Sequence, residues 1–293
     1  MTVIGAIVIA FLCLFGLFVG SFLNVVIYRL PRECLSVVKQ TRSRCPRCAI
    51  QLRWFDNIPL FSWLILLRGR CRNCRAPISV RYPLVEGFTA LCLVALAFWD
   101  RGVKGLDAPL WQTSSWALFA VHALVMATLI ALSVIDLDFR ILPDVITLPG
   151  IVIAPALAFL VPQAMPSPAW LPFGPDPAGL ALRMTALLNG LLGAAAGAGA
   201  LWGIGWLGSK AFRKPAMGLG DVKLYAAMGG LLGLWVFLVL PLASLVGSVI
   251  GIAVLLVKKD HYLPFGPFLA LGMVATWLWG PEMFSALMTW LGH

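Results

Sequence analysis

Four aspartates lie at the ends of long apolar segments. Asp136, Asp138 and Asp144 belong to the stretch IDLDFRILPD, and Asp221 belongs to GLGDVK. Asp136 closes one apolar run and Asp221 opens another, so we expect both to lie at similar depth. Two carboxylates a few ångström apart cannot both ionise, and such a pair can activate a water for attack on an amide carbonyl. Asp136 and Asp221 are therefore predicted to form a catalytic dyad.

The residues beside Asp221 fit this interpretation. Gly218 and Gly220 lack a Cβ, which would leave room for the backbone of an extended substrate. Lys223 offers a partner for a carboxylate, or a side chain that reaches the lipid headgroups. Two other interpretations stay open, because carboxylates at helix ends often serve as interfacial anchors and acids within membranes also relay ions. Against ion transport, none of the acids lies in the middle of an apolar segment, where a transport site is expected.

A second group of residues has the spacing of a metal site. Cys45 and Cys48 form the pair CPRC, and Cys71 and Cys74 form the pair CRNC, with 22 residues between the pairs. Each C-x2-C turn directs two thiolates to one point, and two such turns complete a tetrahedral zinc site. Because sulfur fills all four positions, the metal is predicted to organise the loop rather than to activate water. A reducing cytoplasm disfavours the alternative, a pair of disulfides.

Composition shows which elements must position these side chains. The 293 residues are 61% hydrophobic and only 12% charged, far more apolar than a soluble domain. The sequence predicts an all-α polytopic membrane protein with a small zinc-binding loop. At roughly 20 apolar residues per span, it contains about eight transmembrane helices. They are expected at about 3–28, 82–99, 115–135, 145–162, 184–207 and 264–290, and in 222–257 divided at Pro241.

The charge distribution predicts the orientation in the membrane. Residues 29–81 contain twelve Arg and Lys against two acids, which accounts for the whole net charge of +10. The positive-inside rule places this loop in the cytoplasm. Threading the other spans from it puts both termini in the periplasm and all four aspartates at cytoplasmic helix ends. The proline-rich stretch 162–177 falls on the periplasmic side.

This organisation predicts three parts. Residues 1–28 form the first transmembrane helix, 29–81 a basic loop with the four cysteines, and 82–293 a transmembrane domain that carries the aspartates. Glu86 enters the second span from the cytoplasmic side, and its role stays open.

Several motifs in order resemble one family over nearly the whole chain. The chain resembles the type IV prepilin leader peptidases, bifunctional enzymes of type IV pilus and type II secretion systems. The G-x-G-D motif alone is also shared with presenilin-type and preflagellin peptidases. The proline-rich outer loop is longer than is usual in the family. The matching segments are GSFLNVVIYRLP (20–31), the two cysteine pairs, DNIPLFSWL (56–64), RYPLVE (81–86), IDLDFRILPD (135–144) and GLGDVK (218–223).

The resemblance implies an aspartic endopeptidase of the bacterial inner membrane. It implies cleavage of prepilin and pseudopilin leaders at the cytoplasmic face, followed by N-methylation of the new N-terminal residue with S-adenosylmethionine. The family's catalytic aspartates match Asp136 and Asp221, and Asp138 and Asp144 match supporting positions of the same motif. The resemblance also associates the methylase activity with the cysteine loop, residues 29–81, and the peptidase activity with residues 82–293. The expected partners are these substrates and the lipid bilayer, and no nucleic acid.

The site of the methyl donor is not visible in the sequence. No G-x-G-x-x-G motif follows a strand, and residues 29–81 are too few for a Rossmann domain. Three alternatives to a bifunctional enzyme stay open. They are a peptidase with a purely structural zinc loop, an ion-coupled transporter that uses the same acids, and a membrane scaffold whose loop binds a partner. Which aspartate carries the shared proton also stays open.

Overall fold

The fold is all-α, as the composition predicts. A computed structural model describes residues 3–32, 43–103, 113–166, 180–214, 217–258 and 263–290. These residues contain eight α-helices and no β-strand, only the two isolated bridges Arg44–Gln51 and Arg70–Pro77. The chain divides into two compact units, residues 1–131 and 132–293, and each is described by itself. Most of the proline-rich stretch lies outside the described residues.

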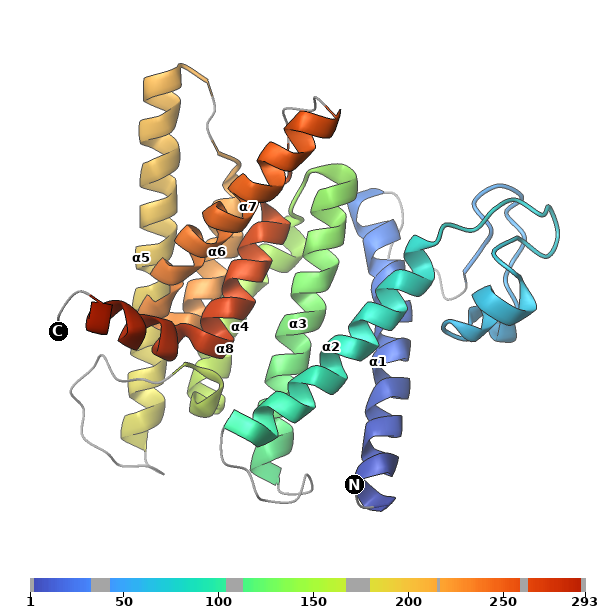
Figure 1. Cartoon of the computed structure of the whole chain (residues 1–293), viewed down its shortest axis with the longest axis horizontal. Helices are drawn as coiled ribbons and strands as arrows, with labels where there is room; N and C mark the ends of the chain where they lie inside the picture. Colours follow the sequence, from blue (N-terminus) through green and yellow to red (C-terminus); the bar gives the residue numbers. More distant parts are fainter. Residues whose placement is uncertain are drawn as a thin grey trace. The chain divides into compact units, whose positions relative to one another are not determined.

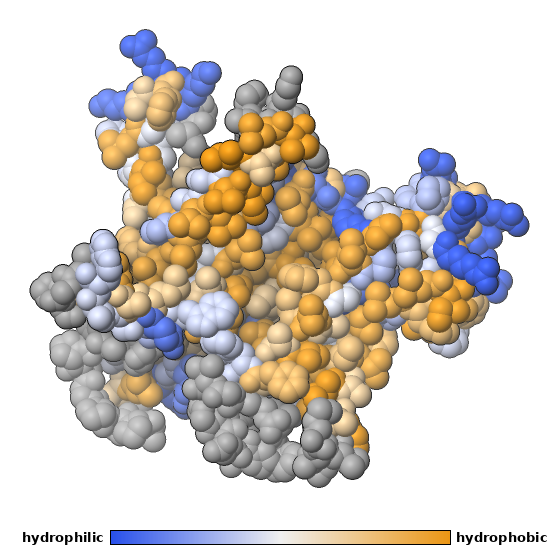
Figure 2. All heavy atoms as spheres, in the orientation of Figure 1, coloured by the Kyte–Doolittle hydropathy of each residue, from blue (hydrophilic) through white to orange (hydrophobic). Residues whose placement is uncertain are grey.

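Long apolar helices confirm the prediction of a multi-pass membrane protein. Within the described ranges, five segments are long and apolar enough to cross a membrane, and a sixth apolar helix, Asp144–Leu160, is shorter. Figure 2 shows apolar side chains along the outer surfaces of the helices, where lipid would cover them. The five segments are Ala6–Arg32, Arg81–Trp99, Trp116–Phe139, Leu180–Phe212 and Leu219–Val254.

In the first unit, α1 (Val3–Arg29) packs against α2 (Arg81–Val103), and the two cross at close range (Figure 1). Two glycines one turn apart permit this contact. A Cβ on Gly16 would lie 2.5 Å from the Cα of Ala90, and one on Gly20 would lie 2.6 Å from the Cα of Glu86. The opposite face of α1 exposes large apolar side chains such as Phe11 and Phe18 to the surroundings.

Short helical turns connect α1 and α2. They are the 3-10 turns η1 (Leu30–Arg32) and η2 (Trp54–Asn57) and the π-helical turn η3 (Ser62–Leu66). The apolar stretch between the cysteine pairs therefore folds into compact turns and does not span the membrane. α3 (Thr113–Phe139) follows, and its last residues belong to the second unit.

The second unit contains α4 (Asp144–Leu160), the turn η4 (Pro162–Ala164), α5 (Leu180–Phe212), α6 (Leu219–Leu232), the turn η5 (Gly233–Trp235), α7 (Val236–Lys258) and α8 (Gly266–Trp290). α6 packs against both α4 and α5, and α7 packs against α8. α5 and α6 meet backbone to backbone, because a Cβ on Gly229 would lie 2.3 Å from the carbonyl oxygen of Gly193.

The predicted division of residues 222–257 at Pro241 is wrong. The chain turns at Gly233–Trp235 instead, and Pro241 lies inside α7. Gly233 adopts φ +61° and ψ −142°, which residues with a Cβ rarely reach. Pro241 is the sixth residue of α7, where its missing N–H removes one helical hydrogen bond without ending the helix.

Replacing Gly229 by alanine tests the close contact of α5 and α6. We expect Gly229→Ala to lower the free energy of unfolding by about 1–3 kcal/mol, because the new methyl group overlaps the backbone of α5. Gly203→Ala in α5 is the matched control, since no atom lies within 4 Å of a Cβ there. Denaturant unfolding in detergent measures both. Equal stability of the two variants would contradict this packing.

Candidate active site and metal centre

Asp136 lies in the last turn of α3 and is buried, with 5% of its surface exposed. Its Oδ2 accepts a hydrogen bond of 2.8 Å from the backbone N–H of Gly266, the first residue of α8. The N-terminus of a helix carries partial positive charge and favours an anion. A Cβ on Gly266 would lie 2.7 Å from the same oxygen, so only glycine fits beside the carboxylate without a shift.

Asp221 lies in the first turn of α6 and is partly buried. The backbone N–H of Gly218, the N-cap residue, interacts with its carboxylate, as in one half of a capping box. Asp136 is the acidic group that acts on Asp221 electrostatically. Both predicted carboxylates therefore lie at helix ends of the second unit, Asp136 at the end of α3 and Asp221 at the start of α6.

The other predicted residues around Asp221 have structural contacts. A Cβ on Gly220 would meet the Cβ of Leu142 at 3.0 Å, so this glycine lets α6 pack on the segment that joins α3 to α4. Lys223 Nζ lies 2.7 and 2.8 Å from the two carboxylate oxygens of Asp144, the first residue of α4. Lys223 and Asp144 therefore connect α6 to α4 at the edge of the site.

Asp138 does not share the position of Asp136. It is exposed, and two residues further along α3 its side chain projects from a different face of the helix. That Gly218 and Gly220 leave room for a substrate backbone stays a prediction.

Sequence reasoning missed Gly266. Its only local signal is the segment LPFGPF (263–268), in which Pro267 falls in the first turn of α8. Proline is common at helix starts, where backbone N–H groups have no helical partner. That pattern identifies a helix start but not the carboxylate that its N–H binds.

The four cysteines of the first unit have the geometry of a tetrahedral metal site. Their sulfur atoms all lie within 4.8 Å of one another. Cys45 and Cys74 Sγ are 3.8 Å apart, and Cys48 and Cys71 Sγ are 3.9 Å apart. Four sulfurs at about 2.3 Å from a central zinc would be about 3.8 Å apart. These two separations match that spacing, so the cluster could hold a zinc ion.

The two cysteine pairs form the same turn twice. Cys45 N–H donates to the carbonyl of Ile50 at 2.9 Å, and Cys71 N–H donates to the carbonyl of Ala76 at 2.8 Å. The residue after each pair, Ala49 or Arg75, has a left-handed φ of 55° or 52°. This repeated turn directs backbone N–H groups to the sulfur atoms, an arrangement that stabilises thiolates.

These N–H groups favour the thiolate form of Cys48 and Cys71, which is the form in which a cysteine binds a metal. A backbone hydrogen bond from Ile50 lowers the pKa of Cys48 to about 6. The backbone N–H groups of Cys74 and Asn73 lower the pKa of Cys71 in the same way.

Two buried carboxylates hold the cysteine loop in place. Asp56 is 7% exposed and pairs with Arg72 at 2.6 Å, which ties η2 to the second cysteine pair. Glu86, in α2, accepts a hydrogen bond of 2.8 Å from the backbone N–H of Leu60, which has φ +56°. Glu86 thereby fixes the segment between η2 and η3 to the start of α2.

Comparison with known proteins places both sites within known sequence families. Residues 14–100 match the bacterial peptidase A24 N-terminal domain, and residues 123–256 match the type IV leader peptidase family. The first match includes the four cysteines and the second includes both aspartates. No solved structure matches the chain significantly.

Curated relatives match over most of their length. A prepilin leader peptidase/N-methyltransferase of Aeromonas hydrophila is 38% identical over 94% of this chain and 92% of its own. A type 4 prepilin-like proteins leader peptide-processing enzyme of Escherichia coli is 39% identical over 89% and 90%. A prepilin leader peptidase/N-methyltransferase of Pseudomonas aeruginosa is 34% identical over 95% and 93%.

The fold and the two sites define a multi-pass α-helical membrane protein with two carboxylates at helix ends and a loop of four clustered cysteines. With relatives this similar over nearly its full length, the chain belongs to the type IV leader peptidase family.

Proposed function

We propose that this protein cleaves the leader peptides of type IV prepilins and type II secretion pseudopilins, and then N-methylates the new N-terminal residue. The observation that supports the peptidase half is that Asp136 and Asp221 both lie at helix ends of one unit, where the charge of Asp136 acts on Asp221 and the N–H of Gly266 holds Asp136. The family and the names of its members support both activities.

Cleavage follows from the chemistry of two carboxylates that share a proton. The ionised aspartate takes a proton from a water, which attacks the scissile carbonyl carbon. The protonated aspartate donates its proton to the carbonyl oxygen, and a tetrahedral intermediate forms. As the peptide bond breaks, the proton taken from the water passes to the leaving amine. One hydroxyl of the intermediate returns a proton to the aspartate that donated it, which restores the pair. The N–H of Gly266 keeps the buried Asp136 carboxylate oriented throughout.

The charge pattern supports a cytoplasmic location for this chemistry. With the basic loop in the cytoplasm, the end of α3 and the start of α6 face the same side, and both termini face the periplasm. A substrate with a basic leader and an apolar helix would then reach the aspartates from the inner leaflet of the bacterial inner membrane.

The four thiolates would hold a structural zinc ion, because all four positions are filled by sulfur. S-adenosylmethionine supplies the methyl group in the second reaction when bound. The protein must then hold the new amino group in its neutral form, since only the neutral amine has a lone pair for the methyl carbon.

One experiment tests the whole proposal. Purified protein is incubated with a prepilin, with and without S-adenosylmethionine, and the product mass is measured. We expect a loss equal to the leader in both reactions, and a further gain of one methyl group only with the donor. A shortened but unmethylated product would show that the protein is a peptidase only, with a structural zinc loop. An intact prepilin would contradict the proposal. Ion transport and a scaffold role would then be the remaining candidate functions.

Gly266→Ala tests the support of Asp136. Because the added Cβ would lie 2.7 Å from Asp136 Oδ2, the carboxylate must move away from its N–H partner. We expect cleavage to slow by about 10². Gly203→Ala, in open space on α5, is the matched control. Cleavage at the wild-type rate by Gly266→Ala would show that this contact does not position the carboxylate.

A further inference from the structure

The apolar stretch between the cysteine pairs exposes large side chains that neither proposed reaction uses. They are Phe61, Leu64, Ile65 and Leu66, with Leu64 and Ile65 each 57% exposed, and together they form the apolar face of the loop. Exposed apolar side chains that adjoin one another mark a contact surface. At the right of Figure 2, where the loop lies in Figure 1, apolar atoms gather on the lower side and hydrophilic atoms along the outer edge.

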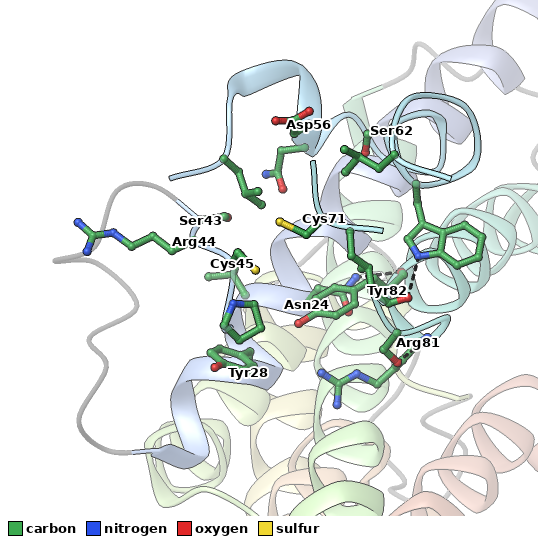
Figure 3. A pocket seen from close by; sticks show the side chains of 18 of the residues that line it. Asn24, Tyr28, Ser43, Arg44, Cys45, Asp56, Ser62, Cys71, Arg81 and Tyr82 are labelled. Atoms are coloured by element: carbon green, nitrogen blue, oxygen red, sulfur yellow. Dashed lines mark hydrogen bonds between the residues drawn. The ribbon is translucent and has the colours of Figure 1, made fainter. Parts of the chain in front are cut away.

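The other side chains of the same turn point inward. Ser62 Oγ donates to the carbonyl oxygen of Ile58 at 2.7 Å, and the indole N–H of Trp63 donates to the carbonyl oxygen of Ile78 at 3.2 Å. Ser62 and Trp63 line a pocket between the loop and the two helices, and Figure 3 shows Ser62 in its wall. Because these two residues are held inward, the apolar face is directed outward.

A hydrogen bond sets the level of the apolar face along α2. The N–H of Leu60, the residue before this face, donates to Glu86 Oε2 at 2.8 Å. The apolar span of α2 begins at Arg81, and Glu86 lies about 7.5 Å further along the helix axis. Leu84, between them, exposes most of its apolar surface. The apolar face therefore starts at the level where α2 enters the bilayer.

The backbone of this turn also suits contact with lipid. Carbonyl groups four to six residues earlier accept the N–H groups of Ser62, Leu64, Leu67 and Gly69. Backbone groups that face lipid need such internal partners, since no water is available there. Arg68 and Gly69 have φ of 48° and 68°, so the chain turns sharply where the apolar run ends.

The charge of the loop identifies the surface that it contacts. Residues 43–81 contain eight arginines and one acid, Asp56. Arg68 and Arg70 follow the apolar face closely and are exposed. Arginines beside apolar side chains are typical of segments that lie at the surface of an anionic bilayer. A second copy of this chain fits less well, because it would bring the same positive charge against these arginines.

We propose that the apolar face seats the cysteine loop in the surface of an anionic bilayer. Its side chains lie among the ends of the acyl chains, and Arg68 and Arg70 lie at the lipid phosphates. The membrane thus holds the loop beside α1 and α2 without a further span. This contact is independent of the proposed peptidase and methyltransferase reactions.

Quenching of fluorescence by lipid measures the contact. The fluorescent amino acid acridonylalanine replaces Ile65, Leu91 or Gln51 in the full-length protein, which is placed in vesicles of phosphatidylcholine and phosphatidylglycerol with brominated acyl chains. Leu91 is exposed within the span of α2 and reports full contact with lipid, and Gln51 is an exposed polar residue of the loop. We expect quenching at position 65 to approach that at position 91 and to exceed that at position 51 several-fold.

The same vesicles test the role of charge. Arg68→Gln combined with Arg70→Gln should weaken quenching at position 65, as should omission of phosphatidylglycerol. Arg183→Gln, which removes an exposed charge from the second unit, is the control and should change nothing. Circular dichroism shows that each protein keeps its helices.

Two results would overturn the proposal. Quenching at position 65 as weak as that at position 51 would show that lipid does not cover the apolar face, and a protein partner or a second copy would then be its occupant. Quenching at position 65 that is insensitive both to the two arginines and to phosphatidylglycerol would show that the contact does not select an anionic bilayer.

Discussion

Asp136→Asn and Asp221→Asn are each expected to slow leader cleavage by about 10³-fold or more, while the protein still inserts and folds. An amide has nearly the same shape as the carboxyl group but cannot take or give the required proton. An asparagine at position 136 keeps an oxygen that can accept the N–H of Gly266, so the local packing is preserved. The measurement is the initial rate of prepilin cleavage by purified variants.

Glu282→Gln is the matched control for these substitutions. It makes the same kind of change at an exposed carboxylate further along α8, the helix that begins at Gly266. Its cleavage rate should equal that of wild type. If either aspartate variant cleaves within about 10-fold of the control, that aspartate is not part of the proton transfer.

Loss of one metal ligand should separate the two activities. Cys71→Ser removes one of the four cysteines that could hold a metal ion. We expect the zinc content to fall from one ion per chain to a small fraction, and methyl transfer to fall by about 10-fold or more. Elemental analysis and methylation of a cleaved prepilin measure these effects. Cleavage should fall less, because Asp136 and Asp221 belong to the other unit.

Cys13→Ser controls for the loss of a thiol in general. Cys13 lies exposed on α1 and outside the four-cysteine cluster, so zinc content and methylation should not change. Full methyl transfer by zinc-free Cys71→Ser would show that the cluster does not shape the methyl-donor site.

The positions of the two aspartates at helix ends could be predicted, because the ends of hydrophobic runs coincide with the ends of helices. Once the ends of α3 and α6 are known, threading the spans from the basic loop predicts a similar depth for the residues at those ends. The paired C-x2-C turns are equally local, since each is built from hydrogen bonds within a few residues. In both cases residues that are close together in the sequence determine the geometry.

Other features depend on contacts between distant segments and could not be predicted. Gly266 lies 130 residues from Asp136, and no periodic pattern links them. The break after α6 requires a glycine at position 233, because its φ is +61° and Asn189 of α5 occupies the space where a Cβ would be. Pro241 looked like the stronger helix breaker, but proline interrupts a helix less severely near its start.

The central claim is that Asp136 and Asp221 act as one catalytic unit, and the double variant tests it most directly. The single-turnover rate of prepilin cleavage is measured for Asp136→Asn, Asp221→Asn and the two combined. Residues that act together are not additive, so all three rates should fall to the same residual level. A double variant that falls far below both single variants, by the product of their separate losses, would show that the two carboxylates act independently and would contradict the claim.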